Sequence, residues 1–253
     1  MIRGKSLAPV CLTGLAIASL SFSNLAKNSN PNIVVILADD MGWGDVNLNG
    51  NPAIETPVLN RLAAQSLSFD RFYVCPLSAP TRAEMLTGRY FLRTGVSSVT
   101  RGYENMRGDE VTLAEVLKEN QYSTGCFGKW HNGRYYPQHP NRQGFDEFVG
   151  LPVGHLGYYF DAWFLHNDEE KQSSGYTSDY FTSQAIDFME RNNDNPCLCY
   201  VSFNVPHSPF QVPEKYFSKY RQAGLDSTLS SINGNPVGAV DCIQGACCGS
   251  HQA

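Results

Sequence analysis

The chain has 253 residues, a formal net charge of −5, and 42% hydrophobic against 17% charged residues. This composition is that of a folded globular protein, and it excludes a disordered chain, a coiled coil and a bundle of membrane helices. Because the charge is mildly acidic and no block of like charges occurs, neither a nucleic acid nor an anionic membrane surface is expected as a partner. The length leaves room for one large α/β domain or two small ones.

The first segment of the chain has the pattern of a secretory signal peptide. Two basic residues precede an apolar run, Leu7–Phe22, that proline and glycine interrupt. This run is short for a transmembrane helix, which needs about 20 apolar residues. We therefore predict a signal peptide over residues 1–26, cleaved after Ser23 or Ala26, and export to the periplasm or the extracellular space without a stable membrane span. An uncleaved anchor is the alternative.

From residue 30 onward the pattern alternates between strands and helices. Ile33–Leu37 is a continuous, largely β-branched run of the kind that lies buried in a parallel sheet. The Thr-Pro pair at 56–57 is typical of a helix start. The stripe that this first helix would bury consists of Val58, Leu59, Leu62 and Ala63. A second short helix is predicted from Pro80 to Thr87, with Gly88 ending it.

The second half of the chain continues the alternation. Thr112 and Glu115 form a capping box that starts a third helix. The inner face of this helix would be Leu113, Val116 and Leu117. Strands are predicted over Tyr122–Phe127 and Cys197–Phe203, with a helix over Ser178–Arg191 between them. This order predicts an α/β fold, a doubly wound and mostly parallel sheet with helices on both faces.

The eight cysteines fit no metal-binding framework, and their spacing gives no disulfide pairing. For the cysteines at 75, 126, 197 and 199 we favour buried free thiols, which behave as small hydrophobic side chains. Cys197 and Cys199 alternate in an apolar run, and we expect them on opposite faces of their strand.

In a doubly wound sheet, ligands bind beyond the carboxyl ends of the strands, and four polar clusters fall at such positions. The first cluster is Asp39-Asp40, just after the Ile33–Leu37 strand. Two adjacent carboxylates repel each other unless a cation lies between them, and oxygen ligands favour calcium or magnesium. A turn that uses aspartates freely is the alternative.

The other three clusters contain the candidate catalytic side chains. Ser78 is expected immediately before the second helix, where free backbone N–H groups favour an anionic group, and Arg82 lies one turn further along. Lys129 and His131 follow the second strand and place a fixed positive charge beside a proton carrier. His207 lies between two prolines after the last strand. Taken singly, these residues also fit an N-cap serine, a solvated loop and a structural histidine.

Together, the four clusters resemble the amino-terminal part of a type I sulfatase, of the alkaline-phosphatase-like superfamily, from about Asn32 to about Leu225. Ser-Ala-Pro-Thr-Arg at 78–82, followed by Leu-Thr-Gly at 86–88, matches the sulfatase signature. Gly-Lys-Trp-His at 128–131 and Pro-His-Ser-Pro at 206–209 match two further elements of that family. The adjacent aspartates match its first pair of metal ligands.

The resemblance implies hydrolysis of sulfate esters, of a sulfated glycan or an aryl sulfate, through a formylglycine nucleophile and a calcium ion. Ser78 would be converted to Cα-formylglycine by an anaerobic sulfatase-maturating radical enzyme. Together with the two adjacent aspartates it would hold the calcium ion, with magnesium as the second choice. Arg82 would steady the aldehyde hydrate, and Lys129 would draw charge from the sulfate. His131 would accept a proton when the covalent sulfate is expelled, and His207 would help to protonate the departing alcohol.

The sequence departs from the family pattern after the Pro-His element. A second metal-ligand pair, an Asp-Asn, and another sulfate-binding lysine are missing from the sequence, and Asn233-Gly234-Asn235 lacks the aspartate. We predict a catalytic portion over residues 30–230, truncated at its carboxy end with apolar faces left open, and an atypical tail over 231–253 that is out of frame or from an interrupted gene. The alternatives are a phosphatase or phosphonate monoester hydrolase of the same superfamily, and an inactive truncated fragment.

Overall fold

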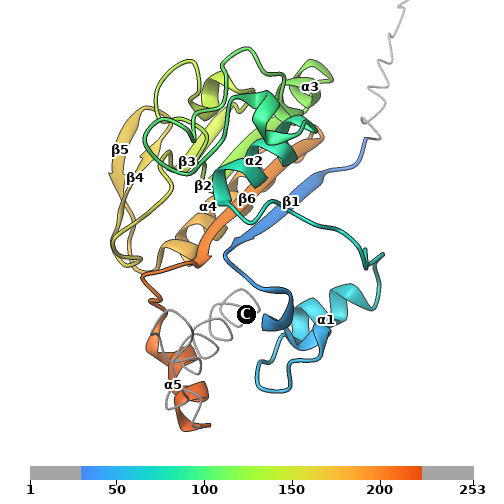
Figure 1. Ribbon diagram of the computed structural model, residues 1–253, viewed down its shortest axis with the longest axis vertical. Coiled ribbons are helices and arrows are strands. Elements are labelled where there is room, and N and C mark those ends of the chain that lie inside the picture. Colours follow the sequence, from blue (N-terminus) through green and yellow to red (C-terminus); the bar gives the residue numbers. More distant parts are fainter. Residues whose placement is uncertain (1–29, 224–253) are drawn as a thin grey trace, which may run out of the picture.

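The computed structural model describes residues 30–223 and contains a six-stranded sheet in the order β1-β6-β2-β3-β4-β5 (Figure 1). The predicted signal peptide and the atypical tail lie outside the described residues. Within residues 30–223, no helix has both the length and the apolar character needed to cross a bilayer.

The parallel part of the sheet consists of four strands. They are β1 (Ile33–Asp39), β6 (Cys197–Pro206), β2 (Ser123–Lys129) and β3 (Glu147–Leu151). Two short antiparallel strands, β4 (Trp163–His166) and β5 (Glu169–Gln172), extend the sheet at the far edge. The fold is therefore the mostly parallel α/β sheet that the sequence predicts. Strands β3, β4 and β5 were not predicted.

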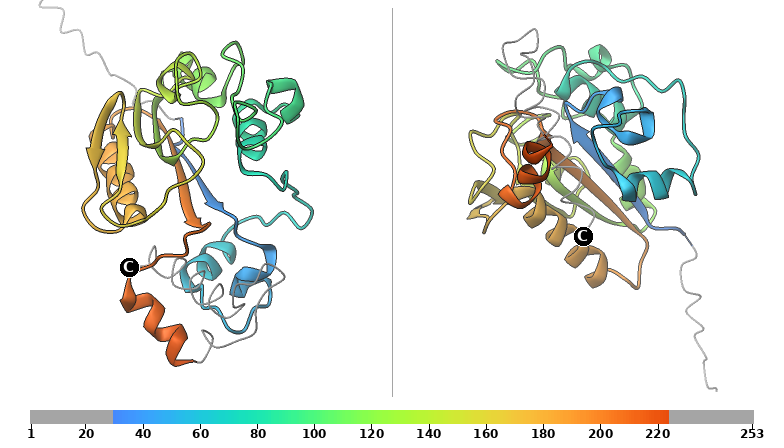
Figure 2. Two further views of the ribbon diagram at one scale, coloured as in Figure 1. Left: turned by 60° about the vertical axis from the view of Figure 1, so that its left-hand side comes forward. Right: turned by 90° about the horizontal axis from the view of Figure 1, so that it is seen from below.

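Helices cover both faces of the sheet (Figure 2). On one face lie α2 (Ser78–Thr87) and α3 (Leu113–Glu119), which share a buried cluster with Cys126, Leu198 and Tyr200 of the central strands. On the other face lies α4 (Thr177–Arg191), whose buried hydrophobic side chains, as predicted, are Phe181, Ala185 and Phe188. Two further helices, α1 (Pro57–Ala63) and α5 (Glu214–Gln222), flank the sheet, and 3-10 helices span Trp43–Asp45, Asn47–Asn49, Phe91–Thr94 and Pro140–Arg142.

Strand β1 was predicted to be buried, but it lies at the edge of the sheet. The side chains of Val34 and Ile36 are 47% and 65% exposed, while Ile33, Val35 and Leu37 pack against the cluster on the α2 face. The burial prediction was wrong because a run of β-branched residues indicates a strand but not how many neighbours that strand has.

Two helix faces and one strand face also differ from the predictions. Helix α1 buries none of its residues, and Leu62 in its predicted stripe is 58% exposed. In α3 the buried residue is Ala114, and of the predicted inner face only Leu117 packs against the buried cluster, whereas Leu113 and Val116 are exposed. Both cysteines of β6, Cys197 and Cys199, lie in the cluster under α4, because residues two apart in a strand share a face. The four described cysteines are free thiols, as predicted.

The carboxyl ends of β1, β6 and β2 meet at one edge of the sheet because these strands are parallel neighbours. The β2 strand passes very close to β6 here. Gly128 has a φ of 104°, and a Cβ built on it would lie 2.0 Å from the carbonyl oxygen of Ser202. Only glycine fits at this position, and it brings the residues that follow it to the edge where β1 and β6 also end.

Candidate active site

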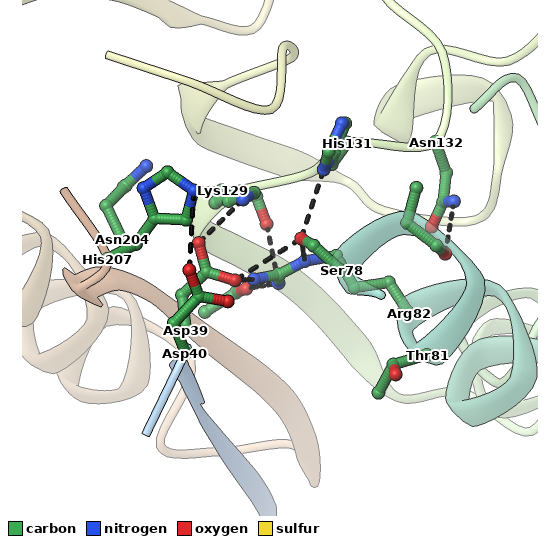
Figure 3. Close-up of polar contacts among 12 residues, drawn as sticks. Asp39, Asp40, Ser78, Thr81, Arg82, Lys129, His131, Asn132, Asn204 and His207 are labelled. Carbon is green, nitrogen blue, oxygen red and sulfur yellow. Dashed lines mark hydrogen bonds and ion pairs between the residues drawn. The ribbon is translucent and has the colours of Figure 1, made fainter. Parts of the chain in front are cut away.

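A buried ion-pair network lies where β1 and β2 end (Figure 3). Asp39, the last residue of β1, accepts from Lys129 Nζ at 2.6 Å through Oδ2 and from Arg82 Nη2 at 3.1 Å through Oδ1. All three side chains are at most 4% exposed. Lys129 is the last residue of β2 and Arg82 lies in α2, so the network ties both elements to the end of β1.

The charged groups of this network shift one another's pKa values. Burial alone would raise the pKa of Asp39, but the positive charges of Arg82 and Lys129 outweigh it and hold that pKa below its ordinary value. Burial lowers the pKa of Lys129, and the attraction of Asp39 opposes this shift only in part. A buried carboxylate shared by two cations is a fixed electrostatic element, and it stays charged at neutral pH.

Ser78 is the first residue of α2, and Leu77 is the N-cap. The prediction that Ser78 precedes the helix was therefore wrong by a residue or two, because Pro80 lies in the third position of the helix and does not open it. The Ser78 hydroxyl lies 3.0 Å from His131 Nδ1 and 3.3 Å from Asp39 Oδ1, and it accepts from Arg82 Nε at 3.3 Å. The predicted neighbours of Ser78 thus surround its hydroxyl.

The ring of His131 has a defined tautomer. Its Nε2 lies 2.9 Å from the carbonyl oxygen of Val99, which can only accept, so Nε2 carries the proton in the neutral ring. Nδ1 is then a free acceptor that faces the hydroxyl of Ser78. Burial, with a further contribution from the charge of Lys129, lowers the pKa of His131 to about 4. His131 is therefore a neutral base at physiological pH.

Asp40 and His207 form a second, more open part of the site. Asp40 has a φ of 63° and a side chain that is 60% exposed, and its Oδ2 lies 3.5 Å from His207 Nε2. His207 immediately follows β6, and its ring centroid lies 5.4 Å from that of His155. All seven predicted site residues therefore gather at one edge of the sheet, five in the buried network and two beside it.

The oxygen atoms of Asp39, Asp40 and Ser78 are the donors that calcium or magnesium prefers, so they fit a hard cation in kind. Their number is small, because calcium takes six to eight oxygen ligands. Among the described residues no group of three His, Cys, Asp or Glu side chains could hold a metal ion, and both oxygens of Asp39 already contact cations. Asp39, Asp40 and Ser78 therefore supply only part of the oxygen ligands that a calcium ion takes.

A cavity of about 820 Å³ opens in front of these groups. Its floor includes Asp40, Ser78, Lys129, His131 and His207. Its outer wall is formed by loops at residues 99–105, 133–138 and 152–155, which sequence reasoning did not connect with the site. A cavity of this volume accommodates a ligand larger than a single sulfate or phosphate ion.

Two supporting contacts were also missed. Arg82 Nη1 donates to the hydroxyls of Tyr200 and Ser202, which the alternation of β6 places on the α2 face. Asn132 is fully buried and donates from Nδ2 to the carbonyl oxygen of Ala79 at 2.9 Å, which ties the loop after β2 to the start of α2. The alternation of β6 was the available signal for the first contact, and the sequence contains none for the second.

Comparison with known proteins gives one consistent family. The model of the sulfatase family matches residues 31–233. N-acetylgalactosamine-6-sulfatase of Mus musculus is 31% identical over 257 residues, covering 90% of this chain and 48% of that protein. The structure of Ps i-CgsB in complex with k-i-k-neocarrahexaose aligns with a TM-score of 0.72 at 29% identity, covering 86% of this chain and 53% of that one.

A second solved structure, in complex with its substrate D-glucosamine-2-N,6-O-disulfate, aligns with a TM-score of 0.69 at 28% identity. The alignment covers 80% of this chain and 39% of that protein. The chain therefore spans about half the length, or less, of these relatives.

Proposed function

The chain belongs to the sulfatase family, and from this premise we propose that it is the catalytic part of an enzyme that hydrolyses sulfate esters of a glycan or an aryl alcohol. The observation that carries the proposal is the hydroxyl of Ser78, held by Arg82 and His131 at the floor of a large cavity. Ser78 is both the residue that matches the sulfatase signature and the residue whose hydroxyl contacts Arg82 and His131.

We propose that Ser78 is converted to Cα-formylglycine by an anaerobic radical maturase, and that calcium, or less suitably magnesium, binds the oxygens of Asp39, Asp40 and residue 78. When bound, the cation would supply positive charge to the nucleophile and to a sulfate oxygen. The remaining ligands would come from outside the described residues. A second hydroxyl at residue 78 matters because a sulfated serine has no neighbouring O–H through which to eliminate sulfate.

The side chains around residue 78 have complementary tasks in this proposal. Arg82 donates to its oxygen and fixes the side chain in the cavity. His131, neutral and with Nδ1 facing the same oxygen, takes the proton that must leave when sulfate is expelled. Lys129 places a buried positive charge at the floor of the cavity for the sulfate oxygens. His207, beside Asp40 at the cavity floor, gives a proton to the departing alcohol.

The substrate class and the location of the enzyme are part of the proposal. One similar structure was solved with its substrate D-glucosamine-2-N,6-O-disulfate and another with k-i-k-neocarrahexaose, which supports a sulfated glycan as the substrate. Export through the amino-terminal segment would bring the enzyme to such polymers outside the cell.

The test is turnover by the full chain after co-expression with an anaerobic sulfatase maturase. Mass spectrometry of the peptide that contains Ser78 should show the loss of two hydrogen atoms, and the chain should then hydrolyse 4-nitrophenyl sulfate in preference to 4-nitrophenyl phosphate. Ser78→Ala should abolish turnover, while Ser66→Ala, a change at an exposed serine that donates only to the carbonyl of Leu62, should not.

The unmodified chain should give at most a single burst of product. Multiple turnovers by a preparation shown to lack formylglycine would contradict the proposed role of the modification. Preference for the phosphate ester would favour the phosphatase alternative, and binding without turnover the inactive fragment.

A further inference from the structure

The cavity that contains Ser78 continues outward to a rim with two arginines, Arg101 and Arg134. Both side chains are exposed, and within residues 30–223 neither has a carboxylate within 4 Å, whereas Arg82, Arg89 and Arg107 all form ion pairs. The guanidinium of Arg134 lies 5.8 Å from the ring centroid of Tyr135, which lines the same cavity. Glu104 is the one acidic side chain among the described rim residues, so the two arginines leave the rim with a formal excess of one positive charge.

The inner part of the site has no such excess. There the charges of Asp39 and Asp40 balance those of Arg82 and Lys129, and Asp39 contacts both cations directly. The calcium ion proposed above would add positive charge at the floor for the sulfate that is cleaved, whereas a second anionic group of the ligand would meet the excess positive charge of the rim. Guanidinium groups bind carboxylate and sulfate oxygens through paired N–H donors, which makes the rim suited to an anionic group.

A third rim residue, Glu104, lacks a hydrogen-bond partner on one side. Its Oε2 is buried and accepts no hydrogen bond in the structure, although Glu104 lines the cavity. A buried acceptor without a donor costs free energy, which a donor on a bound ligand would recover. Sugar hydroxyls and amide N–H groups are such donors. The rim thus contains two unpaired cations and one unpaired acceptor in a single cavity.

We propose that Arg101 and Arg134 form a second anion-binding subsite, and that the substrate is a sulfated sugar bearing a further sulfate or carboxylate beyond the ester that is cleaved. Glu104 accepts a hydrogen bond from a hydroxyl or amide of the same sugar. The cavity of about 820 Å³ is large enough for both anionic groups of such a ligand. This inference rests on the proposed function of the cavity and specifies its substrate.

Calorimetry with the full chain and two sugars tests the subsite. N-acetyl-D-glucosamine 6-sulfate carries one sulfate and D-glucosamine-2-N,6-O-disulfate carries two. The wild-type chain should bind the disulfate at least about tenfold more tightly. The double variant Arg101→Gln/Arg134→Gln should lose this difference, and rising salt should weaken the wild-type preference. The matched control is Arg61→Gln/Arg93→Gln, which changes two exposed arginines that do not line the cavity.

The proposal is overturned if wild type binds both sugars equally or binds neither, or if the control variant loses the preference as well. Failure of the proposed function has a different signature, because the matured chain would then not turn over 4-nitrophenyl sulfate. That ester has no second anion, so the control variant should hydrolyse it as wild type does, and the double variant should lose less activity on it than it loses affinity for the disulfate. A tenfold loss on 4-nitrophenyl sulfate in the double variant would show that the two arginines act at the reacting sulfate and would overturn the second subsite.

Discussion

Replacement of Asp39 by asparagine should destabilise the fold more than any other single isosteric change at the site. The side chain is 4% exposed and neutralises two buried cations, Lys129 at 2.6 Å and Arg82 at 3.1 Å. Within residues 30–223 no other carboxylate lies within 4 Å of either cation. Removing one partner of a buried ion pair costs about 3–5 kcal/mol, out of a total of about 5–15 kcal/mol for a typical domain.

The assay is urea unfolding followed by circular dichroism, in EDTA so that no cation contributes. The matched control is Asp40→Asn, because Asp40 is 60% exposed and contacts only His207, at 3.5 Å, among its described ionic partners. The control should change the free energy of unfolding by no more than about 0.5 kcal/mol. The Asp39→Asn deficit should shrink as the pH rises toward 10, because burial lowers the pKa of Lys129 and its deprotonation removes one unpaired charge.

Equal and small losses in the two variants would refute the reasoning. They would mean that Lys129 and Arg82 reach water or another anion once Asp39 is neutral. A deficit that does not depend on pH would show that the buried lysine is not the source of the cost.

Three further predictions concern the same site. The pKa of His131 is lowered from 6.5 to about 4. The contribution of His131 to stability is therefore complete above about pH 6.5 and is lost as the pH falls toward 4, by about 3 kcal/mol in total. His131→Gln should flatten the pH dependence of urea unfolding across this window. A Cβ at residue 154 would lie 2.0 Å from His131 Nε2, so Gly154→Ala should lower kcat of the matured chain at least about tenfold, whereas Gly157→Ala, with no atom within 4 Å, should leave it unchanged. Calcium should raise the melting temperature of the chain, and a calcium response retained by Asp40→Asn would argue against Asp40 as a ligand.

Much of the parallel sheet could be predicted because its central strands carry a strong local signal. Strand β6 is a largely apolar run that ends in a polar motif, and β2 leads directly into the Gly-Lys-Trp-His motif. The helical spacing of Phe181, Ala185 and Phe188 identifies the buried face of α4. Strand β5 carries no such signal, because it is the exposed sequence Glu-Glu-Lys-Gln at 169–172 and is held by pairing with β4, which is itself only four residues long. Strand pairing depends on the tertiary fold, so it produces no alternation of apolar and polar residues in a sequence like that of β5.

The candidate site was predicted as a set of residues but not as a network. Asp39 and Lys129 end two parallel strands, and Ser78 starts α2 with Arg82 one turn further along. The parallel topology brings such positions together. The direct contacts of Asp39 with both cations were not predicted, since its expected partner was a metal ion. The cavity rim was missed for a different reason, because Arg101 and Arg134 lie in loops whose course depends on tertiary contacts.

The edge position of β1 has a consequence for amide hydrogen exchange. In a parallel ladder the N–H groups of a strand point alternately to its two neighbours, and within residues 30–223 β1 is paired only with β6. Alternate amides of β1 therefore face away from the ladder and should exchange rapidly, while those between them are protected. The regular pairing with β6 runs from Ile33 to Leu37, and a register shift separates it from Asp39, so the carboxylate that organises the site follows an irregularity in a strand that is paired along one side. Any molecule that pairs with the free side of β1 should slow the fast amides selectively, which makes them a reporter of what docks there.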